Sequence, residues 1–284
     1  MVMFTLTISS RYQRVHLKIL VKGNLKVKAV NPVTFVVIAM LLIVTSCTES
    51  SEMAVRVHDQ NRSGRISQDE IWSGTIRVSG DIWVDEDATL TIMPGTSVLI
   101  SAGMDDQNRG SGLNWGEWEK ERLPPIWTEE YAKSHIEING RIIAVGTPDG
   151  MIVFSSDSSN PGFADWSGIE LRPATKMTYC VVEYCRGIGI WSNIPRDDSV
   201  LISNCIVRHI LMGGISLGGT TCAKVISNEV SDCGSEGINV DPGGGAPYIA
   251  YNTVKHSTVG IATLPESSAL IEHNVLIDNT QGIV

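Results

Sequence analysis

The sequence predicts an all-β solenoid, a stack of short coils that repeat one pattern. Asparagine recurs with spacings of 24, 24 and 22 residues, and a Gly-Ile pair follows each asparagine by eight to ten residues. The asparagines are Asn204, Asn228, Asn252 and Asn274, and the pairs begin at Gly214, Gly237, Gly260 and Gly282. A repeat of this length indicates one supersecondary unit per coil, which buries its apolar side only by stacking on its neighbours.

Each coil is predicted to contain about three short strands separated by bends, because the apolar segments are too brief for ordinary helices. Apolar residues stand three positions before and two positions after each asparagine, and we expect their side chains to point inward. These residues are Leu201, Val225, Ile249 and Ile271, then Ile206, Val230, Val254 and Leu276. Upstream, the alternation in 76–78 and 82–84 supports the same assignment.

The four asparagines are predicted to form a structural ladder inside the bends. An asparagine side chain tolerates the left-handed backbone conformation and bonds to neighbouring backbone groups. Copies on stacked strands, about 4.8 Å apart, can also bond to one another. An earlier coil fits the same frame with Cys180 in place of asparagine. We therefore interpret these positions as structural and not as a functional site.

The pattern resembles the right-handed parallel β-helix repeats of pectate-lyase-like proteins. Upstream, residues 89–96, 140–147, 152–156 and 166–169 are similar to the opening coils of bacterial surface β-helix proteins. The resemblance implies a pectin-lyase-like, single-stranded solenoid of about eight coils over residues 66–284. Its last residues fall in the middle of a coil, so we expect a truncated C-terminus. The resemblance leaves function open, because such folds host many activities.

Residues 1–46 predict a lipoprotein signal peptide. They contain six basic residues and no acidic one, and an apolar run follows from Val33 to Thr45. That run is too short for a comfortable membrane span and suits a secretion signal. Residues 44–47 resemble a bacterial lipobox, which implies a lipid on Cys47; a non-lipidated signal or an uncleaved anchor is the alternative. Thr48, by resemblance to enterobacterial sorting, favours the outer membrane, so we expect an exported, lipid-anchored envelope protein.

Removal of this leader makes the chain more acidic. The formal net charge is −9, and loss of six positive charges leaves −15 from Cys47 onward. Nucleic acid is excluded as a partner because its binding depends on basic residues that neutralise phosphates. An acidic polysaccharide would need a calcium bridge or a local basic patch. The five cysteines after Cys47 are expected to be mostly buried thiols, with one disulfide left open, and their spacing does not indicate zinc.

Residues 47–65 are predicted to be a tether, and an EF-hand-like loop spans 59–70. Calcium-binding loops place oxygen ligands at fixed positions around a turn glycine. The matching ligands here are Asp59, Asn61, Ser63, Arg65 through its backbone, and Glu70, with Gly64 at the turn. The segment after Glu70 has the pattern of a strand and not of the exiting helix. Calcium binding and a chance match in a polar tether therefore both remain open.

An insertion at 103–135 interrupts the repeat and carries several aromatic residues among acids. Trp115, Trp118 and Trp127 would suit a sugar ring, whose apolar face stacks while its hydroxyls form hydrogen bonds. The alternative is that these side chains pack the insertion onto the solenoid. Trp191 and Asn239 are expected to point outward on the Gly-Ile strand and are further candidate binding residues.

A polar column is predicted four residues after the ladder position, at the bend before the Gly-Ile strand. Its members are Tyr184, Arg208, Asp232, His256 and Asp278. Asp232 and Asp278 lie two coils apart, about 9.6 Å by strand spacing, near the upper limit of about 9.5 Å for inverting glycosidases. His256 or Arg208 could instead serve as the base of an eliminating enzyme.

Charged residues at a bend are, however, usually just solvated. We therefore expect a non-catalytic cell-envelope β-helix lipoprotein that binds a polysaccharide or an envelope protein along its side. A polysaccharide lyase or a glycoside hydrolase acting in a groove on the helix is the alternative.

Overall fold

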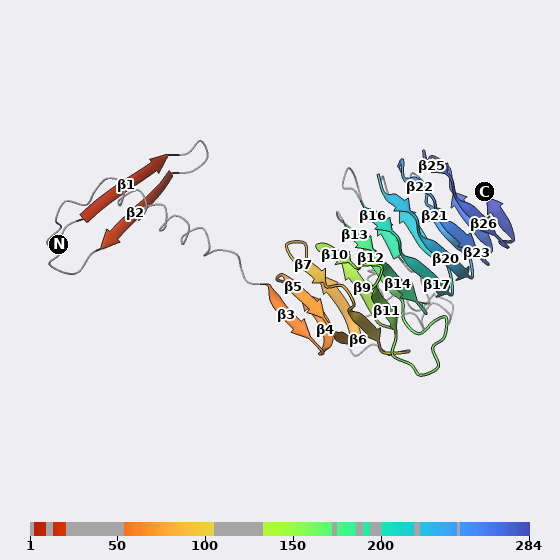
Figure 1. Ribbon diagram of the computed structural model, residues 1–284, viewed down its shortest axis with the longest axis horizontal. Coiled ribbons are helices and arrows are strands. Elements are labelled where there is room, and N and C mark those ends of the chain that lie inside the picture. Colours follow the sequence, from red (N-terminus) through yellow and green to blue (C-terminus); the bar gives the residue numbers. More distant parts are fainter. Residues whose placement is uncertain are drawn as a thin grey trace, which may run out of the picture. The chain divides into compact units, whose positions relative to one another are not determined.

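A computed structural model gives the fold of the chain (Figure 1). It describes residues 54–104, 133–171, 175–185, 200–218, 222–242 and 245–284, and the backbone of strands at 3–9, 14–20 and 190–193. The chain forms two units, Met1–Ser51 and Glu52–Val284. In the first, β1 (Met3–Ser9) pairs antiparallel with β2 (Arg14–Leu20). Within the described residues, no helix has the length and apolar character needed to cross a membrane.

The second unit consists of parallel strands on three sides of a solenoid. One side is a nine-stranded sheet, called sheet 1 here. Its strands, in spatial order, are β3 (Val55–His58), β5 (Glu70–Ser73), β7 (Thr89–Ile92), β10 (Arg141–Val145), β13 (Lys176–Thr178), β16 (Leu201–Ser203), β19 (Lys224–Ile226), β22 (Tyr248–Ala250) and β25 (Leu270–Glu272). One strand per coil gives nine coils.

The other two sides are two rows of strands in one larger sheet, joined by the long strand β6 (Thr75–Val84), which also pairs with β4 (Asn61–Ile66). Row 2 contains β8 (Ser97–Ile100), β11 (Ile152–Ser156), β14 (Cys180–Glu183), β17 (Ile206–Ile210), β20 (Glu229–Cys233), β23 (Thr253–Lys255) and β26 (Val275–Ile277). Row 3 contains β9 (His135–Ile138), β12 (Gly168–Leu171), β15 (Ile190–Asn193), β18 (Ile215–Gly218), β21 (Glu236–Val240), β24 (Val259–Thr263) and β27 (Gln281–Ile283).

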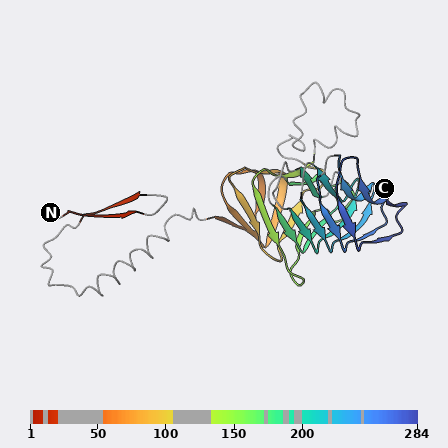
Figure 2. The same cartoon turned by 90° about the horizontal axis from the view of Figure 1, so that it is seen from above.

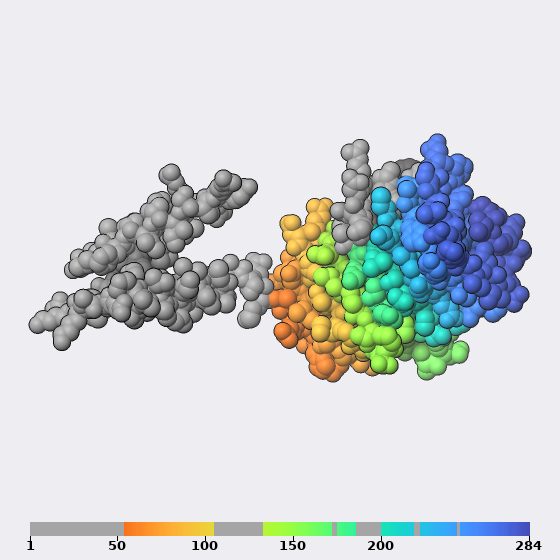
Figure 3. Space-filling view, turned by 45° about the horizontal axis from the view of Figure 1, so that its top comes forward, coloured from red at the N-terminus to blue at the C-terminus, as the bar shows by residue number. Residues whose placement is uncertain are grey.

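Successive coils stack directly on one another in this unit. Figure 2 shows the strands of neighbouring coils side by side, and the colours in Figure 3 follow the sequence in bands along the stack. The predicted fold class, an all-β right-handed parallel β-helix, is confirmed. The first coil, β3 with β4, lies in the segment expected to be a tether, so the solenoid begins at Val55 and not at residue 66.

The core is made of aliphatic columns that run from coil to coil. Val182, Val207, Val230 and Val254 are register partners on neighbouring strands of row 2, and all four side chains are fully buried. Such stacking buries apolar area at each coil boundary, which stabilises the unit by roughly 25 cal/mol per Å² removed from water. Strand alternation thus gives each coil its inward residues.

Three of the four predicted ladder residues bond to one another inside the bend between sheet 1 and row 2. The Asn228 amide nitrogen Nδ2 donates to Asn252 Oδ1 at 3.0 Å, and Asn252 Nδ2 donates to Asn274 Oδ1 at 2.9 Å. Each amide nitrogen also donates to a backbone carbonyl of the preceding coil. The side chains therefore satisfy backbone groups that the bends would otherwise leave unpaired.

Asn204 lies outside this ladder, which corrects the predicted register of its coil by one residue. Asn204 is exposed and has a positive φ of 54°, and Cys205 fills the inward position, where its backbone N–H donates to Asn228 Oδ1 at 2.9 Å. The same shift puts Ile202 and Val207 in the core, where Leu201 and Ile206 were expected. The prediction aligned this coil on its asparagine and so chose the wrong one of two adjacent residues. The small thiol of Cys205 fits the inward position equally well.

The Gly-Ile pairs are explained by close contact between coils. A Cβ on Gly214 would lie 2.6 Å from the backbone oxygen of Gly237, and one on Gly237 would lie 2.9 Å from that of Gly260. The Gly260 position meets the Gly282 oxygen at 2.7 Å in the same way. Distances under 3 Å are too short for a carbon–oxygen contact. These three positions lie against the backbone of the next coil and therefore require glycine.

The described cysteines are free thiols, and all but Cys222 are buried. Burial raises the pKa of Cys185 above its ordinary value and that of Cys233 to about 12. Cys180 and Cys205 occupy the same inward column and not offset positions, and a hydrogen bond between their side chains raises the pKa of Cys180. These buried thiols therefore pack as small apolar groups.

Candidate functional site

In five successive coils, the bend between row 2 and row 3 presents one outward side chain. We call the residues Tyr184, His209, Asp232, His256 and Asp278 the bend column; each has a positive φ, between 50° and 64°. The left-handed conformation turns the chain so that this residue points outward and the next one points inward. This left-handed conformation is uncommon for residues other than glycine. His209 holds the position predicted for Arg208, a consequence of the same one-residue register shift.

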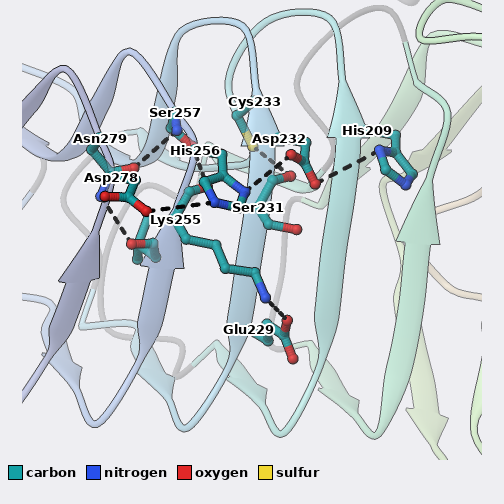
Figure 4. Close-up of polar contacts among 11 residues, drawn as sticks. His209, Glu229, Ser231, Asp232, Cys233, Lys255, His256, Ser257, Asp278 and Asn279 are labelled. Atoms are coloured by element: carbon teal, nitrogen blue, oxygen red, sulfur yellow. Dashed lines mark hydrogen bonds and ion pairs between the residues drawn. The ribbon is translucent and has the colours of Figure 1, made fainter.

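The polar part of the column alternates imidazole and carboxylate groups (Figure 4). His256 Nδ1 lies 3.4 Å from Asp232 Oδ1, and His256 Nε2 lies 4.0 Å from Asp278 Oδ2. His209 Nδ1 lies 3.8 Å from the other Asp232 oxygen. These contacts become ion pairs when the imidazoles are protonated. The Asp278 side chain is 79% exposed and that of His209 is 32% exposed.

The other end of the column is aromatic. The Tyr184 ring stacks on the His209 ring with centroids 5.2 Å apart and planes 20° apart. The Phe163 ring, from the loop between β11 and β12, meets His209 edge-on at 5.6 Å. Phe163 is 46% exposed, so this cluster offers apolar ring surface to solvent beside the polar groups. This contact could not be predicted from the repeat, because Phe163 lies outside it.

The outward face of row 2 borders the column with paired charges. Arg208 Nε donates to Glu183 Oε2 at 2.8 Å, and Ser155 donates to the other oxygen of Glu183 at 2.8 Å. Lys255 Nζ donates to Glu229 Oε1 at 2.6 Å, and this hydrogen bond raises the pKa of Lys255. Arg208 and Lys255 are therefore already neutralised by glutamates, which weakens this surface as a binding site for anions.

On row 3, Asn239 forms a small polar cluster. Its Nδ2 donates to Asp241 Oδ1 at 2.7 Å and to Ser216 Oγ at 3.3 Å. Trp191 is the register partner of Ser216 on the preceding coil, and only its backbone is described. The predicted binding residues Trp115, Trp118 and Trp127, and the predicted lipidation site Cys47, lie outside the described residues.

The residues predicted to bind calcium do not surround a common point. Asn61, Ser63 and Arg65 lie on the extended strand β4. Glu70 is buried, where it pairs with Arg62 and accepts a hydrogen bond from Trp72 Nε1 at 2.9 Å. Asp59 Oδ1 accepts a hydrogen bond from the backbone N–H of Thr75. The described part of the chain holds no group of three or more His, Cys, Asp or Glu side chains able to bind a metal ion. Calcium binding by 59–70, whose predicted ligands also include Asn61, Ser63 and a backbone carbonyl, stays a prediction.

The sequence suggested Asp232 and Asp278 as the carboxylate pair of an inverting glycosidase. An inverting pair of carboxylates keeps a gap between them for a water molecule. Here the His256 ring lies between Asp232 and Asp278, and each of its nitrogens faces a carboxylate. The ring therefore stands in the space that such a pair would leave for water, and its side chain is 50% exposed.

One family model agrees with the fold. The family model "Right handed beta helix region" matches residues 167–284. A mutant of the periplasmic alginate epimerase AlgG is 12% identical in sequence, covering 73% of this chain and 55% of that chain, with a TM-score of 0.34. A second structure of periplasmic AlgG is 14% identical, with coverage of 73% and 56% and a TM-score of 0.27.

This chain therefore spans little more than half the length of those two structures. A search of curated proteins found no match. The repeat, the parallel sheets and the family model agree: the chain is a right-handed parallel β-helix repeat protein.

Proposed function

We propose that the protein binds a glycan along the bend column and does not cleave it. One observation carries this proposal: successive coils present Tyr184, His209, Asp232, His256 and Asp278 in a single line, with Phe163 beside its aromatic end. The side chains repeat at the strand spacing, about 4.8 Å. A linear polymer of rings and hydroxyls matches a line of aromatic faces and hydrogen-bonding groups.

The charges favour a neutral glycan. Asp232 and Asp278 repel anions, and the neighbouring Arg208 and Lys255 are paired with glutamates. The mature chain, if the leader is removed, also carries a formal charge of −15, six below the −9 of the full sequence. Carboxylates accept hydrogen bonds from sugar hydroxyls, which a neutral polymer supplies in quantity.

Retention on polysaccharides tests this proposal. The purified full chain is applied to neutral polymers (cellulose, xylan and starch) and acidic ones (alginate and polygalacturonate), and both retention and released products are measured. We expect retention on at least one neutral polymer, no product, and affinity about tenfold weaker in Phe163→Ala and in Asp232→Asn. Asp87→Asn, an exposed carboxylate away from the column, is the matched control and should bind normally.

Absence of retention on every polymer would contradict the proposal. Product release that disappears in Asp232→Asn or His256→Ala would instead establish the alternative, a polysaccharide lyase or glycoside hydrolase.

The proposed location is the bacterial cell envelope, with a lipid on Cys47. The support is the basic leader, the short apolar run and the lipobox-like residues 44–47. We expect the wild-type chain to incorporate labelled fatty acid and to sediment with outer membranes, and Cys47→Ser to do neither. Unchanged labelling and sedimentation of Cys47→Ser would rule out this anchor; Cys222→Ser is the control for loss of an exposed thiol.

A further inference from the structure

A second column of outward residues lies at the other edge of row 2, at the bend from sheet 1. We call Tyr179, Asn204, Ser227, Tyr251 and His273 the opposite column; their φ angles run from 51° to 58°. In this column, rings at both ends flank two short polar side chains. Each residue stands one position before the inward residue of its coil, so the five share one line along the stack.

Tyr251 is the prominent member of this column. Its ring is stacked on the His273 imidazole, with centroids 5.0 Å apart and planes 11° apart. Tyr251 is nevertheless 55% exposed. His273 covers one face of the ring, and the other face is turned toward the coil of Ser227, whose side chain is small and exposed. The Tyr251 ring therefore offers an aromatic face next to an open position.

The next coil bonds to the backbone of Tyr251, whose N–H donates to the Glu272 carbonyl at 3.4 Å. Tyr248 Oη donates to Glu272 Oε1 at 2.8 Å, and this hydrogen bond raises the pKa of Tyr248. A bulky residue at positive φ costs more than asparagine or glycine would at the same bend. An exposed tyrosine in this conformation adds little to the core, so stability does not explain its presence. Backbone strain that stability does not explain is a reason to look for function.

We propose that the free face of Tyr251 is a stacking site for one pyranose ring of a neutral glycan. A pyranose has an apolar C–H face that packs on an aromatic ring and a rim of hydroxyls that need hydrogen-bond partners. Ser227 and Asn204 supply such partners one and two coils away, at about 4.8 and 9.6 Å by strand spacing. The negative charge of Glu272, on the coil next to Tyr251, disfavours binding of an anionic sugar.

This site is distinct from the bend column. Asn204 and His209 are five positions apart across row 2, which corresponds to roughly 16 Å of extended chain. The two columns run parallel along the same row, so the protein would hold glycan at two lines. The inference uses the ligand class of the proposed function, but it requires none of the bend-column residues.

The test compares three single variants and one double variant of the full chain. Calorimetry with neutral hexasaccharides of β-1,4-glucose, β-1,4-xylose and α-1,4-glucose measures binding, and thermal melting measures the fold. Tyr251→Asn is expected to melt at or above the wild-type temperature, since asparagine tolerates the left-handed conformation, and to bind at least tenfold more weakly. Tyr251→Phe keeps the ring and should bind within twofold of wild type. His209→Ala disrupts the bend column alone.

The outcomes separate the two proposals. Weaker binding in Tyr251→Asn with normal melting, rescued in Tyr251→Phe, supports the stacking site, and a further loss in the double variant with His209→Ala shows two independent sites. Binding that depends on His209 and not on Tyr251 overturns this inference and leaves the proposed function standing. No binding of any hexasaccharide by the wild type overturns both.

Discussion

Replacing Asn228 with leucine is expected to lower the free energy of unfolding by about 2 to 5 kcal/mol. Asn228 is almost fully buried, its Oδ1 accepts a hydrogen bond from the Cys205 backbone N–H at 2.9 Å, and its Nδ2 donates to the Ile202 carbonyl at 3.0 Å. Leucine has a similar size but no polar atom, so both backbone groups would lose these bonds away from water. The bond from the Asn228 backbone N–H to Asn252 Oδ1 would remain.

Urea denaturation followed by far-ultraviolet circular dichroism measures this loss. Asn204→Gly is the control: Asn204 is exposed, lies outside the ladder, and has a positive φ that glycine adopts without strain. We expect its denaturation midpoint to stay near that of wild type. Equal shifts in the two variants would mean that the ladder contributes nothing specific.

Substituting alanine for Gly214 is expected to cost about 3 kcal/mol, because the added Cβ overpacks a coil boundary. It would lie 2.6 Å from the Gly237 backbone oxygen, 2.8 Å from Val230 Cγ1 and 2.9 Å from Cys233 Sγ. The Gly237 oxygen belongs to the neighbouring strand of row 3, so it cannot move away without disturbing the hydrogen bonds of that strand.

The adjacent residue supplies a matched control for this substitution. A Cβ on Gly213 would meet its nearest neighbour, the Glu236 backbone oxygen, at 3.6 Å, an ordinary contact. Gly213→Ala should therefore leave the thermal midpoint almost unchanged, whereas Gly214→Ala lowers it by several degrees. If both variants melt alike, close contact between coils does not explain the Gly-Ile repeat.

Much of the fold could be predicted from the sequence, because periodicity reports which residues face inward. The aliphatic frame around Val230, Val254 and Leu276 predicted the strands of row 2, and the Gly-Ile pairs predicted those of row 3. The first coil was missed because Val55 to Ile66 is polar and lies where an EF-hand-like pattern competes with the strand pattern.

The candidate site was predicted in part. Asp232, His256 and Asp278 stand where the asparagine frame put them, at the bend before the Gly-Ile strand. Arg208 was placed there in error, since Asn204 and Cys205 are adjacent and either one fits the frame. Only the contact between the Cys205 backbone and Asn228 Oδ1 decides between them.

The sequence by itself determined the repeat length, the inward alternation and therefore the solenoid class, because these depend on residues close together in the chain. The tertiary structure alone decided which side chains share a column. A one-residue shift in one coil exchanges Arg208 for His209 at the bend, since neighbouring residues of a strand point to opposite sides. The tertiary structure also brings Phe163 to His209 and Tyr251 to His273. These contacts join different coils, and the register of the coils depends on the packing of the whole stack.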